Sequence, residues 1–289
     1  MPSSSSKPPV AATPLAASYA HARQIARSRA KNFYYSFVLL DRQRRDSLCA
    51  VYAFMRHCDD LSDEPGATAA ALDAWRQEMV AALGHDYGAN PLWPGFVDTI
   101  ERYRIPHQYL HDMIDGVGSD LARNRIESFD ELYRYCYQVA SVAGLCLVHI
   151  FGFREQRALE LAEKCGIAFQ LTNILRDVGE DYENGRIYLP RQDRERFAVA
   201  EGSLARQTVS EPLRQLLAEY AGRARGYFDE ANPLLDLVDP SCRSSLWALI
   251  TIYSRLLDRI VAKRYEVLGQ RIRLSTLEKS AIVAKAFIS

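Results

Sequence analysis

Two stretches of this chain carry oxygen-bearing side chains at the spacing of one helix face. In the first, Asp59 and Asp63 are four residues apart, which places both carboxylates on the same side of a helix. In the second, Asn173, Asp177 and Asp181 form a ladder with the same spacing. Like charges at this spacing destabilise a helix by about 0.2–0.5 kcal/mol per pair, so the pattern has no local structural benefit.

The sequence around both ladders indicates a site that binds metal and phosphate. Strongly apolar positions precede each ladder, and an arginine lies within one turn of the acids, Arg56 in the first and Arg176 in the second. A solvated acidic face is the alternative interpretation of such a ladder. Oxygen ligands without a Cys or His set favour Mg²⁺, with Mn²⁺ as a substitute, held by carboxylates together with substrate phosphates. We therefore predict Mg²⁺ ions that bind a diphosphate, with the arginines as bidentate donors.

A diphosphate neutralised in this way is a good leaving group. Its departure from an allylic carbon leaves a carbocation, which survives only in a dry, apolar chamber. Residues 135–153 contain no Asp, Glu, Lys or Arg and could line such a chamber. A membrane span is the alternative for a stretch of this length. Because Gln138, Ser141, Gly144 and His149 interrupt it, we expect a buried helix instead.

The elements that must position these side chains are helices. From Tyr19 onward the apolar periodicity is helical, and no run alternates in the manner of a strand. Turn-forming Pro and Gly residues divide the chain into about eight to ten helices without a long linker. We expect a Ser/Pro/Ala-rich disordered tail over residues 1–17 and a single all-α catalytic domain over residues 18–289.

Composition excludes several other classes of protein. Lys and Arg together number 36, as do Asp and Glu, and no basic stripe suggests a nucleic-acid partner. The six cysteines form no CxxC pair, so we interpret them as small buried side chains in a reducing compartment. Without a secretory signal, we expect a cytoplasmic protein that associates with the inner membrane at most loosely. Oligomeric state is not indicated by the sequence.

Two segments resemble the squalene/phytoene synthase family. The segment over residues 166–190 contains Gln170-Leu171-Thr172-Asn173-Ile174-Leu175-Arg176-Asp177-Val178-Gly179-Glu180-Asp181, followed by Arg186-Ile187-Tyr188-Leu189-Pro190. The segment over residues 32–64 contains Asp59-Asp60-Leu61-Ser62-Asp63. The order and separation of the motifs match, and the likeness extends over about residues 25–275. The resemblance implies the isoprenoid synthase fold, an all-α helical bundle around a cavity that runs from a metal-rich mouth to an apolar base.

The resemblance also implies roles for individual side chains. The implied metal ligands are Asp59, Asp63, Asn173, Asp177 and Asp181. The implied diphosphate contacts are Arg56, Arg176, Arg186, Tyr188 and Arg271, with Phe33 as a substrate-binding flap. Tyr52, Tyr135 and Gln170 would lie near the reacting carbons, with Tyr52, Tyr135 and Arg176 in catalytic roles. Tyr135 could instead be a core tyrosine. Four small residues could either allow close helix packing or leave room for an isoprenoid tail: Ala140, Ala143, Gly144 and Ala162.

The implied reaction is a head-to-head (1′-1) condensation of two farnesyl diphosphates to presqualene diphosphate, squalene or both. Asn32-Phe33-Tyr34-Tyr35 resembles bacterial members with this activity, although the serines that many members carry there are absent. Phe54, Phe169 and Leu145 could close the base of the cavity against a longer tail. NADPH would be required only if squalene is the final product, and no Gly-rich nucleotide fingerprint is present.

Three alternatives remain open from the sequence. The first is a phytoene synthase that condenses two geranylgeranyl diphosphates. The second is head-to-tail elongation or terpene cyclisation on the same fold, although those enzymes do not share the context of residues 186–190. The third is a non-catalytic helical assembly factor. The presence of every expected carboxylate argues against this alternative.

Overall fold

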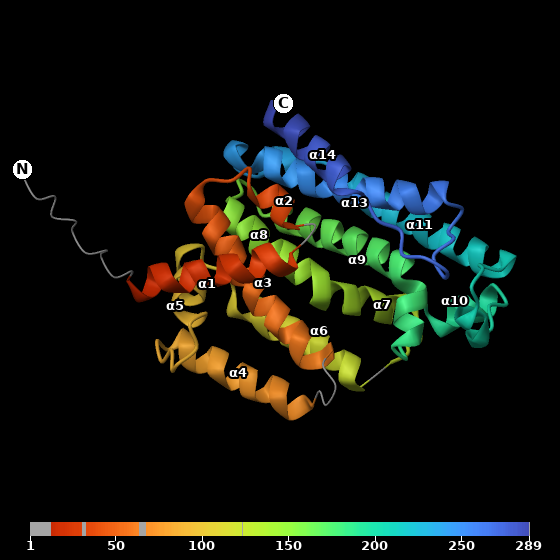
Figure 1. Cartoon of the computed structure of the whole chain (residues 1–289), viewed down its shortest axis with the longest axis horizontal. Coiled ribbons are helices and arrows are strands. Elements are labelled where there is room, and N and C mark those ends of the chain that lie inside the picture. The colour runs from red at the N-terminus through yellow and green to blue at the C-terminus, as the bar shows by residue number, and fades with distance from the viewer. Residues whose placement is uncertain (1–12, 31–32, 64–67, 123, 289) are drawn as a thin grey trace, which may run out of the picture.

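Figure 1 shows the computed structural model, which describes residues 13–30, 33–63, 68–122 and 124–288. Those residues are arranged as α-helices, as expected, and they contain no extended strand. Two isolated bridges, Arg125 with Ile187 and Phe153 with Val238, are the β-type pairings among them. The all-α prediction is confirmed.

The helices follow one another with short connections. In chain order the α-helices are α1 (Pro14–Arg29), α2 (Phe33–Phe37), α3 (Arg42–Asp63), α4 (Ala69–Leu83), α5 (Trp93–Arg102), α6 (His107–Ala122), α7 (Phe129–Cys136), α8 (Val142–Phe151), α9 (Arg157–Glu183), α10 (Arg191–Arg196), α11 (Glu211–Ala231), α12 (Leu234–Leu237), α13 (Arg243–Ala262) and α14 (Thr276–Ile288). A π-helical turn, η1 (Tyr137–Ser141), separates α7 from α8. The short 3-10 helices η2 (Glu201–Ala205) and η3 (Pro240–Cys242) lie in connections.

The first helix begins earlier than the sequence indicated. Thr13 is its N-cap and accepts a hydrogen bond from the amide of Ala16 at 3.3 Å, and Pro14 occupies the first helical position. Residues 14–17 are therefore helical, although they were expected to belong to a disordered tail over residues 1–17. Residues 1–12 lie outside the described part of the chain.

Helix α9 forms the centre of the bundle. It has 27 residues and packs against α7, α8, α11, α13 and the turn η1. Figure 1 shows α11, α13 and α14 on one side of α9, with α3 and then α4, α5 and α6 towards the other. Helix α3 packs against α1, α5, α6 and α8. The two helices that carry the acidic ladders thus each pack against several other helices.

The uncharged stretch over residues 135–153 is broken by the π-helical turn. Two glycines allow neighbouring helices to approach this turn closely. A Cβ added to Gly166 of α9 would lie 2.4 Å from Cα of Ser141, and one added to Gly116 of α6 would lie 2.6 Å from Cβ of Gln138. Within the described ranges, no helix combines the length and apolar character that crossing a bilayer requires. The expectation of a buried helix is confirmed for α8, most of whose residues are buried.

An aromatic cluster fills the interface between α3, α4 and α5. Phe54 is completely buried, with its ring centroid 4.6 Å from that of Phe96 and 5.7 Å from that of Trp75. Trp75 in turn stacks on Trp93 at 4.4 Å.

All six cysteines are buried and free, and burial raises the pKa of Cys49 to about 12. These thiols are packing side chains, as the sequence indicated.

Candidate active site

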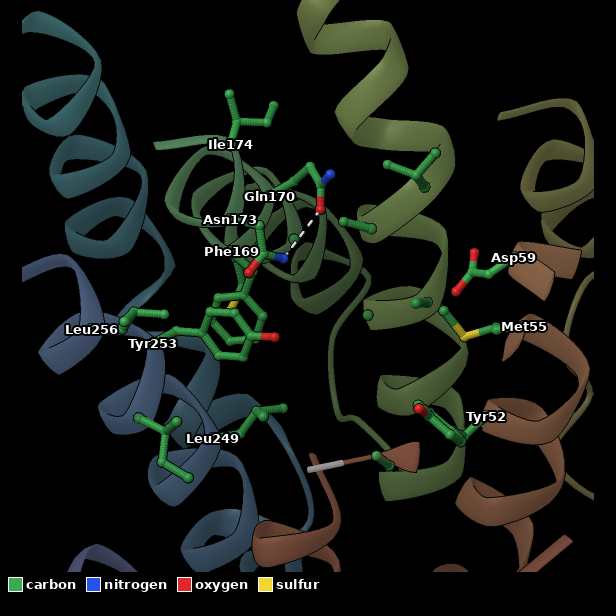
Figure 2. Close-up of a pocket in the computed structure, with 18 of the residues that line it drawn as sticks. Tyr52, Met55, Asp59, Phe169, Gln170, Asn173, Ile174, Leu249, Tyr253 and Leu256 are labelled. Atoms are coloured by element: carbon green, nitrogen blue, oxygen red, sulfur yellow. Dashed lines mark hydrogen bonds between the residues drawn. The ribbon is translucent and has the colours of Figure 1, made fainter. Parts of the chain in front are cut away.

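A cavity of about 570 Å³ lies between α3, α6, α8, α9 and α13, and residues 271–274 cover one side of it. Helix α3 supplies Tyr52, Met55 and Asp59, whose spacing of three and four places them on one face (Figure 2). Figure 2 shows this face opposite α9 and α13, with the side chains of both walls directed into the space between them.

The second ladder lies on the α9 wall of the cavity. Gln170, Asn173, Asp177 and Asp181 all line it, so the predicted spacing places these side chains on one face. The amide nitrogen of Asn173 donates a 3.3 Å hydrogen bond to Oε1 of Gln170 (Figure 2). Oδ1 of Asn173 is buried and accepts no hydrogen bond from the described residues. An oriented, unsatisfied oxygen of this kind is suited to bind a cation.

Two guanidinium groups meet at the carboxylate of Asp177. Nε of Arg176 lies 2.7 Å from Oδ1 of Asp177, and Nε of Arg271 lies 2.9 Å from the same oxygen. Arg271 also pairs with Glu180 at 3.0 Å, an acid that sequence reasoning did not assign to the site. Guanidinium groups are planar and bidentate, so this part of the cavity offers donors that match diphosphate oxygens.

The last carboxyl of the ladder is poorly solvated. Burial, together with the charges of Asp177 and Glu180, raises the pKa of Asp181 to about 8, although the charge of Arg186 acts in the opposite direction. The charged carboxylate is therefore disfavoured until a cation lies nearby. In the described part of the chain, no group of three Asp, Glu, His or Cys side chains could hold a metal ion by itself. Mg²⁺ usually takes one or two carboxylates plus substrate phosphates, and these residues fit that form of binding.

The first ladder has a different arrangement. Asp59 lines the cavity together with Arg56, and Arg56 forms an ion pair with Asp60 one turn further along α3. Asp63 ends α3 and Phe33 begins α2, but the side chains of both lie outside the described residues. Their predicted roles as metal ligand and flap therefore stay predictions.

Two stacked tyrosines line the cavity beside Asp120 of α6. The rings of Tyr135 and Tyr188 are 4.8 Å apart and nearly parallel, and each hydroxyl donates a 3.0 Å hydrogen bond to the Asp120 carboxylate. Burial raises the pKa of both phenols well above the usual range, so they are neutral at physiological pH. Sequence reasoning missed Asp120. It follows Met113 and Val117 at helical spacing, and an acid on that buried face was the available signal.

The apolar part of the cavity is built around a stacked aromatic pair. Phe169 and Tyr253 lie 4.2 Å apart with a 9° angle between their rings, and Leu249 and Leu256 lie beside them on α13 (Figure 2). Across the cavity, burial raises the pKa of the Tyr52 phenol to about 12. The four small residues also belong to the lining, namely Ala140, Ala143, Gly144 and Ala162.

The bulky residues expected to close the cavity are mostly elsewhere. Phe169 lines it, but Phe54 belongs to the aromatic cluster on the other face of α3, and Leu145 is buried outside the lining. The expectation that Phe54 and Leu145 shorten the cavity is wrong. Instead, Ala and Gly residues form part of the wall. A Cβ on Gly144 would lie 3.3 Å from the carbonyl oxygen of Ala162, so these residues provide close packing and cavity space together.

Comparison with known proteins identifies the family. The sequence profile of the squalene/phytoene synthase family matches residues 10–278. The chain belongs to the squalene/phytoene synthase family. Members of this family are prenyltransferases that condense prenyl diphosphates head to head, so the predicted family and enzyme class are confirmed. Isoprenoid diphosphates are the substrates on which the family acts.

Relatives and solved structures of this family cover nearly the whole chain. It is 36% identical to a phytoene synthase of Arthrospira platensis, over 95% of this chain and 94% of the relative. It is 34% identical to a 15-cis-phytoene synthase of Synechococcus elongatus, over 94% of this chain and 93% of that relative. A crystal structure of a dehydrosqualene synthase in complex with a ligand superposes with a TM-score of 0.88 at 30% identity, covering 94% of this chain and 95% of that one.

Proposed function

We propose that this squalene/phytoene synthase family member condenses two molecules of geranylgeranyl diphosphate head to head into phytoene. The supporting observation is its likeness, at 34–36% identity, to proteins named phytoene synthase over almost the full length of both chains. Our expectation of farnesyl diphosphate rested in part on Phe54 and Leu145 as a floor, and neither lines the cavity. The small residues of the wall are better suited to the longer C20 tail.

In this proposal the polar end of the cavity binds the diphosphates. Arg56, Arg176, Arg186 and Arg271 would hold diphosphate oxygens. Tyr188, the other diphosphate contact that the resemblance implied, donates its hydroxyl proton to Asp120 instead. Asp59, Asn173, Asp177 and Asp181 would hold Mg²⁺, or Mn²⁺ in its place. When bound, the metal would neutralise charge on the leaving diphosphate and assist its departure.

The apolar end would protect the carbocation that ionisation leaves. Leu249, Leu256 and the small residues exclude water, which would otherwise capture the cation as an alcohol. The rings of Phe169 and Tyr253 present aromatic faces to the same space, and aromatic faces attract cations. Tyr52 on the opposite wall is buried enough to stay a neutral phenol. Gln170 would lie between the two ends.

Condensation of two farnesyl diphosphates is the second candidate. It is favoured by the TM-score of 0.88 and 30% identity to a dehydrosqualene synthase. The resemblance of residues 32–35 to bacterial members that make presqualene diphosphate or squalene points the same way. A reductive step to squalene would require NADPH, whereas phytoene formation requires no reductant.

A competition experiment separates the two candidates. Purified protein would receive equal concentrations of C15 and C20 diphosphates with Mg²⁺, with and without NADPH, and products would be identified by mass spectrometry. We expect phytoene to predominate in both arms. A predominance of C30 products would overturn the C20 assignment, and the absence of any condensed product would overturn the proposed activity. A parallel reaction with EDTA controls for metal-independent products.

A further inference from the structure

The cluster of Asp120, Tyr135 and Tyr188 brings together three separate elements. Asp120 lies near the end of α6, Tyr135 near the end of α7, and Tyr188 in the segment between α9 and α10. Each carboxylate oxygen of Asp120 accepts one hydrogen bond from a phenol. Oδ2 accepts from Tyr135 and Oδ1 from Tyr188, both at 3.0 Å. All three residues line the cavity. The cluster therefore has a defined geometry and access to a substrate.

The two phenols are fixed in orientation. A hydrogen bond holds each hydroxyl, and the rings stack on each other with an interplanar angle of 19°. One residue, Cys136, separates Tyr135 from the π-helical turn η1, against which α6 and α9 pack closely at Gly116 and Gly166. The segment that carries Tyr188 is held near the end of α6 by a 2.9 Å hydrogen bond from the amide of Ile187 to the carbonyl of Asn124.

This geometry determines what the Tyr135 oxygen can do. Since its own proton is donated to Asp120, the phenol oxygen can accept a proton from elsewhere only through a lone pair. The phenol is neutral at physiological pH because burial and the charge of Asp120 raise its pKa. A neutral phenol is a weak base by itself. It becomes an effective proton acceptor when a carboxylate can take its own proton at the same time.

Head-to-head condensation needs such an acceptor. After the first carbon–carbon bond forms, the intermediate is a carbocation that must lose a proton to close the cyclopropane ring. We propose that Asp120 is a positioning residue that acts through Tyr135 in this step. The substrate C–H bond breaks, and its electron pair closes the ring at the cationic carbon. The released proton goes to the Tyr135 oxygen, and the phenol proton passes to Oδ2 of Asp120.

The step is balanced without any further reactant. A cation and a carboxylate become a neutral ring and a carboxylic acid, so no oxidant or reductant is consumed. Tyr188 has the supporting role of holding the second carboxylate oxygen, which keeps Oδ2 directed at Tyr135. This inference rests on the proposed head-to-head condensation. It is the same for C15 and C20 substrates, because the reacting carbons are the same in both.

The substitution Asp120→Asn tests the proposal with whichever diphosphate the enzyme condenses. Asn keeps the size of the side chain and can still accept a phenol proton in a hydrogen bond, but it cannot take that proton up. We expect kcat to fall about 100- to 1,000-fold with KM changed less than about threefold, as for the loss of a general base. Diphosphate release should continue, and water should capture the cations that are not deprotonated, so the ratio of alcohols, prenyl and condensed, to ring-closed product should rise. Asp115→Asn is the matched control, since Asp115 lies on the same helix, outside the cavity lining, and pairs with Arg76.

A double-mutant cycle shows whether Asp120 acts through Tyr135. If both belong to one proton path, Asp120→Asn combined with Tyr135→Phe should be no slower than the slower single variant. Melting temperatures of all variants would be measured in parallel. If the Asn variant does not fold, Tyr135→Phe alone should still raise the alcohol ratio, since it leaves Asp120 bonded to Tyr188.

Three results would overturn the proposal: wild-type kcat in Asp120→Asn, rate losses that multiply in the double variant, or an unchanged alcohol ratio. They are distinct from a failure of the proposed function. In that case the wild-type protein itself would release no condensed product.

Discussion

The guanidinium of Arg271 lies 2.9 Å from the carboxylate of Asp177, although the two residues are 94 positions apart in the chain. This ion pair fastens the segment between α13 and α14 over the polar end of the cavity. Gly179 of α9 permits the close approach, because a Cβ there would lie 3.2 Å from the carbonyl oxygen of Leu268. The segment also brings Ile272 and Leu274 into the cavity lining, so it covers both the polar and the apolar surface.

Arg271→Ala should weaken substrate binding and turnover together. A hydrogen bond to a charged group contributes about 1.5–3 kcal/mol, so we expect kcat/KM to fall roughly 10- to 100-fold. Arg271→Lys should recover little of this, because an ammonium cannot bind two oxygens side by side. Steady-state kinetics at saturating Mg²⁺ would measure both. Arg225→Ala is the control, since Arg225 pairs with Asp258 away from the cavity. Equal effects of the two alanine variants would contradict the assignment of Arg271.

Asp181→Asn should abolish turnover without destabilising the metal-free protein. Burial raises the pKa of Asp181 to about 8. Between the ordinary pKa of an aspartate and pH 8, this carboxyl is therefore protonated in the folded state and ionised in the unfolded state. Wild-type stability should therefore fall, through this group, as the pH rises from about 4 towards 8. The Asn variant lacks that penalty.

Melting temperatures without metal would test the sign of this effect. The melting temperature of Asp181→Asn relative to wild type should increase between pH 6 and pH 9. Addition of Mg²⁺ with inorganic diphosphate should then stabilise the wild type more than the variant, because binding to the folded state raises apparent stability. A variant that melts lower than wild type at pH 9, or that keeps its activity, would contradict the predicted role.

Gly166→Ala should deform the cavity wall. The added methyl would lie 2.4 Å from the Cα of Ser141, a backbone atom that a side-chain rotation cannot move. Overpacking of this kind costs about 1–3 kcal/mol, which denaturant unfolding would detect. Activity should fall as well, because the displaced turn begins two residues after Tyr135.

Gly226→Ala in α11 is the matched control for this substitution. An added Cβ at this helical glycine meets nothing within 4 Å, so Ala should stabilise the protein by about 0.5–1 kcal/mol. If the Gly166 and Gly226 variants were equally stable, the close contact with η1 would not constrain the fold.

The parts of the site that the sequence predicted are those in which one helix decides the geometry. Asn173, Asp177 and Asp181 share a face because the spacing of four residues places them there in any helix. The same argument should have excluded Phe54, which follows Tyr52 by two residues and so points to nearly the opposite side of α3. The expectation took the size of the Phe54 side chain into account but not the direction in which it leaves the helix.

Features that depend on contacts between distant segments could not be predicted in this way. Asp120 meets Tyr135 and Tyr188 across 15 and 68 positions of the chain, and no local pattern specifies that meeting. The π-helical turn adds one residue to a helical turn and thereby shifts the register of α8 relative to α7. Simple helical periodicity across residues 135–153 therefore assigns some side chains of α8 to the wrong direction.

Glu278→Gln should weaken the attachment of α14 in a pH-dependent manner. The guanidinium of Arg259 and the amide and hydroxyl of Ser275 donate hydrogen bonds to Glu278 and lower its pKa to about 2. A lowered carboxyl pKa contributes stability that is present above about pH 4.5 and is lost as the pH falls towards 2. The melting temperature of the variant should therefore lie below that of wild type at pH 7, with the two converging near pH 2.5. Glu155→Gln, at an exposed position before α9, is the control. A constant difference between Glu278→Gln and wild type over this pH range would show that the glutamate charge contributes nothing.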